Sequence, residues 1–196
     1  MIIGVTGGIG SGKSFVSRLL GRLLEIEVLD ADTLCRHKLE PDMPGWKGVK
    51  EKWGSRFINI AGHIDRAALR KALFSDAEVR CNVEQLLHPL VRKEILQFAM
   101  KMSKQRLGMV VEVPLLFEVG WQADFDVVVT VYARQDSCLK RIVKRDKVTL
   151  EEGKASINAQ MSLKEKALLA DCVIDNSGPL ALTIVQVYHL ARLFGM

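Results

Sequence analysis

Apolar residues follow two patterns along this chain. In some segments they form short, unbroken runs rich in branched side chains, and in others they recur every three or four positions. The short runs are typical of buried strands and the periodic segments of helices. The runs that predict strands lie at 1–6, 26–30, 109–113, 125–132 and 171–175. Because helical segments separate these runs, the sequence predicts an α/β fold built on a parallel sheet.

The segment between the second and third predicted strands is much longer than a simple crossover requires. It is rich in turn residues from Pro41 to Gly62 and then helical in spacing up to Met102. Pro89 interrupts the helical pattern, which predicts a kink or the start of a new helix there. We interpret the whole segment as an inserted helical lobe.

A glycine-rich segment directly follows the first predicted strand and precedes a helical pattern. It fits G-x-x-x-x-G-K-[ST], the loop whose backbone N–H groups bind the phosphates of a nucleoside triphosphate. Lys13 would place its ammonium group at the β- and γ-phosphates, and Ser14 its hydroxyl on Mg²⁺. The predicted phosphate loop consists of Gly7, Gly8, Ile9, Gly10, Ser11, Gly12, Lys13 and Ser14.

Acidic residues stand where the second and third predicted strands end. The carboxyl ends of parallel strands share one edge of the sheet with the phosphate loop, so Asp30 and Asp32 are expected near the γ-phosphate. There a carboxylate can accept the proton of an attacking hydroxyl or position Mg²⁺. Alternatively, Asp32 only caps a helix that begins at Thr33. Glu112 corresponds to the second acid of phosphate-loop proteins, which holds Mg²⁺ directly or through water.

Basic residues gather in the helical segment from Ser137 to Lys147, where Asp146 is the single acid. Arg141 and Arg145 are four residues apart and therefore lie on one face of the helix. Such a surplus of positive charge repels itself unless an anion binds, so we interpret the segment as a lid that closes on phosphates. The alternative is an ordinary charged helix. Thr149-Leu-Glu-Glu152 has the form of a capping box and predicts the next helix.

Length and composition limit the function classes. The chain has 196 residues, which suits one main domain with a small insertion, and 28 Lys+Arg against 23 Asp+Glu, which suits an anionic small molecule. No pattern for binding single-stranded nucleic acid, no metal-binding Cys/His spacing, no apolar run of membrane-spanning length and no signal peptide are found. We therefore expect a cytoplasmic protein without nucleic-acid or membrane partners, whose oligomeric state the sequence does not indicate.

Several motifs occur together and in order over nearly the whole length. In addition to the phosphate loop they include Asp30-Ala-Asp32, Ile64-Asp-Arg-Ala-Ala-Leu69, His88-Pro89-Leu-Val91, Pro114-Leu-Leu-Phe-Glu118, Arg141 and Arg145 ahead of Gln160, and Ala170-Asp-Cys-Val-Ile-Asp-Asn176. With these motifs the chain resembles the dephospho-coenzyme A kinases, the phosphate-loop enzymes that complete coenzyme A synthesis. The resemblance implies a phosphate-loop kinase core with a five-stranded parallel sheet, an inserted helical substrate lobe and a helical lid.

We expect one domain with these parts in fixed segments of the chain. The core spans about residues 1–40, 105–135 and 170–196, the substrate-binding insertion about 41–104 and the lid about 136–169.

The resemblance also implies the reaction and the roles of individual residues. ATP would donate its γ-phosphoryl group, with Mg²⁺, to the 3′-hydroxyl of the ribose of dephospho-coenzyme A. Asp32 would be the base, and Lys13, Arg141 and Arg145 would act on the transferring group. The substrate would contact Asp32, Arg66, His88, Pro114 and Leu115. The nucleotide would contact the phosphate loop, Phe15, Arg145 and Asn176, and the metal would contact Ser14 and Glu112.

Three residues depart from the family pattern. Phe15 stands where a hydroxyl residue usually contacts the α-phosphate, Glu112 where many relatives carry Asp, and Ser156 where many carry another lid arginine. Phe15 and Glu112 affect the expected affinity for the nucleotide and its metal ion, and Ser156 leaves fewer arginines in the lid.

Two other functions use the same core. One is a kinase for a different small hydroxyl acceptor, such as a nucleoside monophosphate or shikimate, although the inserted lobe with His88-Pro89 argues against it. The other is a nucleotide-dependent switch, but the two D-x-x-G matches do not directly follow the third strand and no N-K-x-D motif is present.

Overall fold

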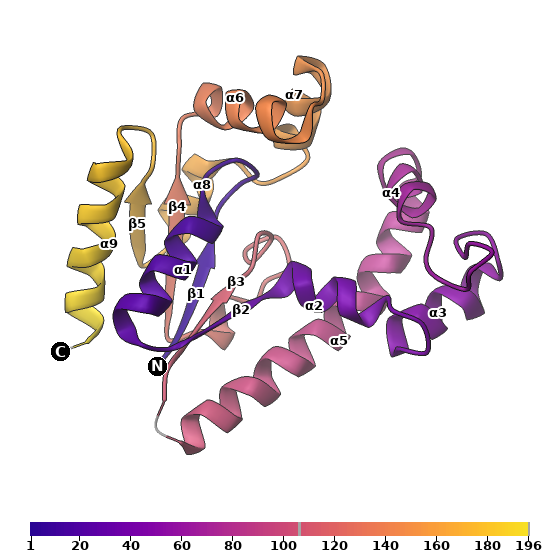
Figure 1. The fold of residues 1–196 in the computed structure, drawn as a ribbon, viewed down its shortest axis with the longest axis horizontal. Helices are drawn as coiled ribbons and strands as arrows, with labels where there is room; N and C mark the ends of the chain where they lie inside the picture. The colour runs from indigo at the N-terminus through magenta and orange to yellow at the C-terminus, as the bar shows by residue number, and fades with distance from the viewer. Residues whose placement is uncertain (106, 196) are drawn as a thin grey trace. The chain divides into compact units, whose positions relative to one another are not determined.

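A computed structural model of the protein describes residues 1–105 and 107–195 (Figure 1). The chain divides into two compact units, Met1–Asp30 with Phe98–Met196, and Ala31–Gln97. The chain thus leaves the first unit after the second strand and returns to it shortly before the third.

The first unit contains a five-stranded parallel sheet, as predicted. Its strands are β1 (Ile2–Thr6), β2 (Glu27–Asp30), β3 (Met109–Glu112), β4 (Val127–Tyr132) and β5 (Cys172–Asp175), in the order β2-β3-β1-β4-β5. The register places Glu112 opposite Val5 on one side and opposite Asp30 on the other. The acids at the ends of β2 and β3 are therefore neighbours at the edge from which the phosphate loop leaves β1.

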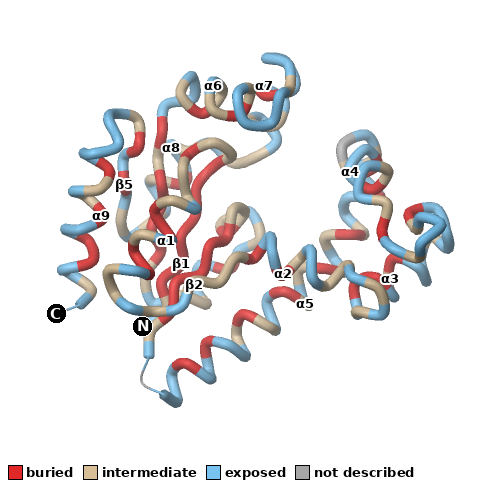
Figure 2. The backbone as a smooth tube through the Cα atoms, viewed as in Figure 1, coloured by how far each residue is buried: buried red, intermediate tan, exposed pale blue. Residues whose placement is uncertain are grey.

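Helices α1 (Lys13–Leu24) and α9 (Leu180–Phe194) pack together against one face of this sheet. The strands contribute every second residue to that core, as in Ile3 and Val5 of β1 or Val129 and Val131 of β4. Figure 2 shows the buried positions concentrated in these strands and on the inner sides of the helices. Burial of this face stabilises the sheet against α1 and α9. The ends of the loop between β1 and α1 are thereby held in place.

The remaining helices of the first unit follow β4. They are α6 (Gln135–Asp146), α7 (Leu150–Asn158) and α8 (Leu163–Leu169), with a short 3₁₀ turn, η1 (Gln122–Asp124), before the strand. Capping boxes begin α7 at Thr149 and α8 at Ser162, and the first of them confirms the helix start that Thr149-Leu-Glu-Glu152 predicts. Helix α8 lies against β4.

The second unit is helical and has a core of its own. It contains α2 (Ala31–Lys38), α3 (Pro44–Trp53), α4 (Arg66–Ser75) and most of α5 (Ala77–Lys104). Trp46 and Phe57 are buried in this core, and the Trp46 indole donates a hydrogen bond to the Gly62 carbonyl at 2.9 Å. These aromatic residues therefore serve as packing anchors in the second unit.

The prediction that the helix begins again at Pro89 is wrong, because α5 continues through this proline. Buried apolar residues recur at four-residue intervals on both sides of it, at Val83, Leu87, Val91 and Ile95. Packing of this continuous stripe outweighs the loss of one backbone hydrogen bond at the proline. Although α5 has 28 residues, none of the described helices is long and apolar enough to cross a membrane.

Candidate functional site

The phosphate loop connects β1 to the first residue of α1, Lys13. Gly12 has a φ angle of 98° and Gly10 one of 77°, a region that side chains with a Cβ rarely adopt. A Cβ at Gly10 would also lie 2.7 Å from the carbonyl oxygen of Cys138. Only glycine fits at this position, and the loop delivers the N-terminus of α1, with its positive end of the helix dipole, to the site.

The two predicted metal ligands are in direct contact. The Ser14 hydroxyl donates a 2.7 Å hydrogen bond to Oε1 of Glu112, and Glu112 is only 6% exposed at the end of β3. A hydroxyl and a carboxylate are oxygen ligands of the kind that Mg²⁺ prefers. These two residues therefore fit the ligand set of a magnesium ion bound beside a phosphate.

The outer side of the phosphate loop is held by side chains from distant parts of the chain. The Asn176 amide donates to the Ser11 carbonyl at 2.7 Å. The Arg141 guanidinium donates to the carbonyls of Gly10, Ser11 and Asn176 at 3.2, 3.4 and 2.9 Å. Both predicted site residues thus lie at the loop and support its backbone.

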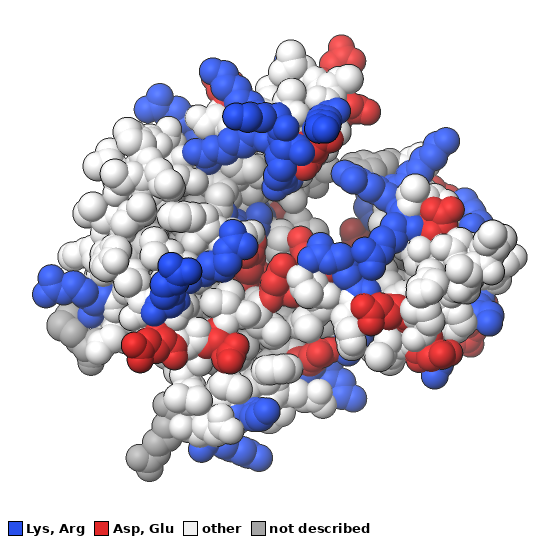
Figure 3. Space-filling view, in the orientation of Figure 1, with Lys and Arg blue, Asp and Glu red and all other residues white. Residues whose placement is uncertain are grey.

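These contacts correct one expectation about the lid. We expected its arginines to repel one another until an anion bound, but Arg141 and Arg145 both have partners within the protein. Arg145 donates to both carboxylate oxygens of Asp146, at 2.7 and 2.8 Å, and its side chain is 63% exposed. Figure 3 shows lysines and arginines gathered over α6 and α7. Helix α6 is positively charged, but its Arg141 already binds backbone carbonyls of the phosphate loop and of Asn176.

Lys13 and the first departure from the family pattern lie at the start of α1. The Lys13 ammonium group donates to the Gly8 carbonyl at 3.2 Å, across the phosphate loop. The Phe15 side chain is half-buried against the apolar core of the sheet. Phe15 therefore contributes packing at the position where the family pattern usually has a hydroxyl residue.

Asp32 does not cap a helix that begins at Thr33, because α2 begins at Ala31, directly after the last residue of β2. Asp32 is the second residue of the helix and is exposed. The alternative interpretation as a cap is therefore wrong. Asp30 and Asp32 also do not share a strand face, because the strand ends between them.

The residues expected to bind the acceptor are divided between the two units. Arg66, exposed in the first turn of α4, and His88, half-buried on α5, belong to the second unit together with Asp32. Pro114 and Leu115 belong to the first unit, in the turn that follows β3. The Pro114 carbonyl accepts a hydrogen bond from the Thr6 hydroxyl at 3.3 Å.

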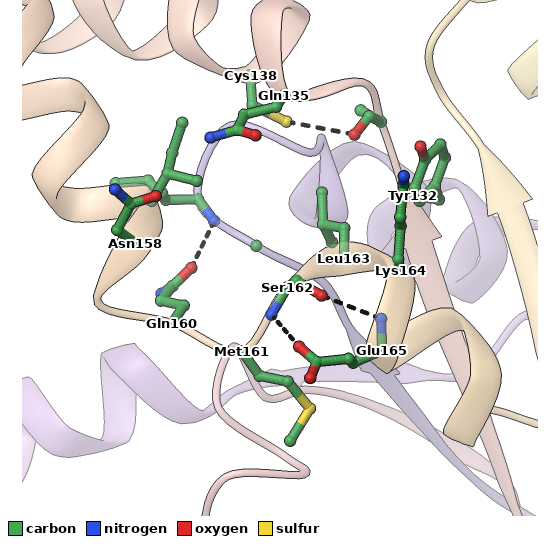
Figure 4. Close-up of a pocket in the computed structure, with 14 residues that line it drawn as sticks. Tyr132, Gln135, Cys138, Asn158, Gln160, Met161, Ser162, Leu163, Lys164 and Glu165 are labelled. Carbon is green, nitrogen blue, oxygen red and sulfur yellow. Dashed lines mark hydrogen bonds between the residues drawn. The ribbon is translucent and has the colours of Figure 1, made fainter.

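Sequence reasoning assigned no role to Gln160, which the structure places against the phosphate loop. Its Oε1 atom accepts a 2.8 Å hydrogen bond from the backbone N–H of Ile9. Both residues line a cavity of about 550 Å³ between the phosphate loop, the start of α6 and the segment from 157 to 165 (Figure 4). Gln160 belongs to one of the motifs named above, but its place in that motif does not indicate a contact with the phosphate loop.

Comparisons with known proteins identify the family of the chain. A family model described as Dephospho-CoA kinase matches residues 1–181. A relative from Carboxydothermus hydrogenoformans named Dephospho-CoA kinase is 39% identical over 192 residues, covering 97% of this chain and 93% of the relative. The solved structure of Dephospho-CoA kinase from Campylobacter jejuni has a TM-score of 0.73 and 26% identity, and the match covers 99% of this chain and 96% of that one.

Shikimate kinase from Acinetobacter baumannii shares the fold more distantly. Its structure matches with a TM-score of 0.54 and 18% identity over 98% of this chain and 92% of that one.

The two lid arginines should differ in their effect on stability. Arg141→Ala removes hydrogen bonds from a charged donor to the carbonyls of Gly10, Ser11 and Asn176, and we expect the free energy of unfolding to fall by about 2 kcal/mol. Arg145→Ala removes an exposed pair with a sequence neighbour and should change it by less than about 0.5 kcal/mol. Urea denaturation of both variants measures the difference. Equal stability of the two variants would contradict the supporting role of Arg141.

Burial lowers the pKa of His88 from its usual value of 6.5, and the nearby Glu84 carboxylate only partly offsets this shift. The unfolded chain therefore binds the proton more readily, so stability is lost as the pH falls from 6.5 through the lower folded-state pKa. We expect the advantage in melting temperature of wild type over His88→Gln to shrink between about pH 7.5 and about pH 5. A constant difference across that range would contradict the shift.

Proposed function

The chain belongs to the dephospho-CoA kinase family, and we propose that it transfers the γ-phosphoryl group of ATP to the ribose 3′-hydroxyl of dephospho-coenzyme A. The observation that carries this proposal is the hydrogen bond between Ser14 and Glu112, which joins the phosphate loop to the acid of β3. It supports a magnesium nucleotide site in a chain that the family model matches from residue 1 to residue 181.

On the donor side, the phosphate loop and the N-terminus of α1 bind the phosphates, and Lys13 stabilises negative charge on the transferring group. Ser14 and Glu112 hold Mg²⁺, which neutralises phosphate charge when it is bound. Among the residues that the structure describes, no group of three or more His, Cys, Asp or Glu side chains could hold a metal ion. The other ligands would therefore be phosphate oxygens and water, as is usual for Mg²⁺.

On the acceptor side, Asp32 accepts the proton of the 3′-hydroxyl, while Arg66 and His88 bind dephospho-coenzyme A together with Pro114 and Leu115. Since burial lowers the pKa of His88, its imidazole is neutral near pH 7 and contacts the substrate by hydrogen bonding. Asp30 and Glu112 are the alternative bases.

The lid completes the site around the nucleotide. Arg145 lies exposed on α6. It gives up its hydrogen bonds to Asp146 and binds the transferring phosphoryl group instead. For Arg141, which the resemblance assigns to the same group, we propose an indirect role. Together with Asn176 it holds the carbonyls of the phosphate loop, and both contribute to nucleotide binding through the loop that they support. We propose a cytoplasmic location, in keeping with a small-molecule substrate.

Release of ADP that depends on the acceptor separates this function from its rivals. A kinase for a nucleoside monophosphate or shikimate would release ADP with that acceptor and not with dephospho-coenzyme A. A nucleotide-dependent switch would hydrolyse ATP slowly whatever hydroxyl compound is added.

The first test of the function is the Lys13→Ala variant, with Lys101→Ala as its control. Lys101 is an exposed lysine of α5 outside the site. We expect dephospho-coenzyme A to stimulate ADP release by the wild type and by the control. Lys13→Ala should lose at least ~100-fold in kcat, because it removes a preorganised charge from the transition state. The function would be refuted by a wild type that dephospho-coenzyme A does not stimulate, and the loop assignment by a fully active Lys13→Ala enzyme.

The second test concerns the base. Asp32→Asn keeps the size of the side chain, and the favourable charge that it removes from the first turn of α2 is worth less than about 1 kcal/mol. It cannot accept a proton, and general-base catalysis is typically worth ~10² to 10⁴-fold in rate. We expect a nearly unchanged melting temperature, retained ATP binding and a loss of at least ~100-fold in kcat.

Asp30→Asn in the same assay is the matched control for the base. If Asp32→Asn loses less than tenfold while Asp30→Asn loses more, the base is Asp30.

A further inference from the structure

Lys166 is wholly buried, although it belongs to a short helix whose neighbouring charged residues are exposed. Its side chain is 0% exposed, whereas Lys164 and Glu165 on the same helix, α8, face solvent. A lysine is rarely buried unless its ammonium group is paired and fully hydrogen-bonded, because removing the charge from water is costly. Burial accordingly lowers the pKa of Lys166, and its neighbour Glu118 partly offsets the shift.

Both partners of the Lys166 ammonium group belong to the turn that follows β3. It donates to the Pro114 carbonyl at 2.6 Å and to Oε1 of Glu118 at 2.8 Å. The Pro114 carbonyl also accepts from the hydroxyl of Thr6, the last residue of β1 before the phosphate loop. Lys166 thus holds the first and last residues of the segment Pro114–Glu118 at once.

The Glu118 carboxylate also binds the segment that contacts the phosphate loop. Its Oε1 atom accepts a hydrogen bond from the backbone N–H of Met161 at 3.0 Å. The preceding residue, Gln160, accepts the bond from the Ile9 N–H of the phosphate loop, which Figure 4 shows from the side of the cavity. The turn after β3 and the phosphate loop are therefore connected through side chains, in addition to the sheet.

We propose that Lys166 and Glu118 are positioning residues for phosphoryl transfer, which hold the turn beginning at Pro114 in a fixed position relative to the phosphate loop. This inference rests on the proposed function, in which Pro114 and Leu115 contact the acceptor. Displacement of a substrate-positioning segment by about 1 Å can cost on the order of 10²-fold in rate. The Lys166 side chain is 0% exposed and that of Glu118 22%. An ion pair with a buried member is a weak source of stability, because apolar residues of similar volume often replace it without loss.

The test is the double variant Lys166→Met/Glu118→Leu, with the two single variants and Lys101→Met as the control. The double variant leaves no buried charge unpaired, so we expect its melting temperature to stay within about 5 °C of wild type. It should lie above that of Glu118→Leu, which leaves the buried Lys166 ammonium group without its carboxylate. Its kcat/KM for dephospho-coenzyme A should nevertheless fall by ~10 to ~100-fold. The Kd for ATP, measured by calorimetry, should stay within about threefold, because the bonds of Arg141 and Asn176 to the loop are retained.

A purely structural role predicts a different result. In that case activity per folded molecule would follow the melting temperature, and the double variant would regain wild-type kcat/KM as it regains stability. That result would overturn the inference alone, provided that wild-type ADP release depends on dephospho-coenzyme A. Absence of that dependence in the wild type would overturn the proposed function and this inference with it.

Discussion

The geometry of the peptide plane imposes the constraint on which the site depends. Each plane carries its N–H and its C=O on opposite sides, so a loop that directs N–H groups at an anion must direct carbonyl groups into the protein. Those carbonyls need donors. Asn176, 165 residues away from Ser11 in the sequence, and Arg141 of α6 supply them. The phosphate loop is local in sequence, but its conformation is stabilised by the second half of the chain.

The positions of the strands could be predicted well. A strand in a buried parallel sheet requires a short, unbroken apolar run, and few other elements show that pattern. The helix start at Leu150 could be predicted equally well, since a capping box is a local hydrogen-bonding unit. Of the two alternatives predicted at Pro89, a kink or a new helix, the new helix was wrong. There a local rule about backbone donors opposed a stripe of buried residues, and the packing decided the result. Propensity is a weak guide wherever tertiary contacts decide the result.

In the site, the contact between Ser14 and Glu112 followed from topology, because both residues stand where parallel elements meet one edge of the sheet. The partners of Arg141 could not be predicted in the same way. Its acceptors are backbone carbonyls, which every residue type has, so the sequence does not show where they lie. The positive charge of the helix therefore predicts an anion-binding lid. The role of Lys166 could not be predicted for a related reason. An amphipathic pattern assigns lysine to the exposed face of a helix and does not indicate that it pairs with an acid 48 residues earlier.

Asp30 and Asp32 are two residues apart in the sequence, but they belong to different compact units. The boundary between the two compact units falls between them, since one unit ends at Asp30 and the other begins at Ala31. Asp30 stays on the sheet opposite Glu112, beside the proposed metal ligands. Asp32 belongs to the helical unit that carries Arg66 and His88, the residues proposed to bind the acceptor. A carboxylate on the unit that carries Arg66 and His88 is the better candidate for taking the acceptor's proton, and one fixed beside Glu112 is the better candidate for balancing the charge of the metal.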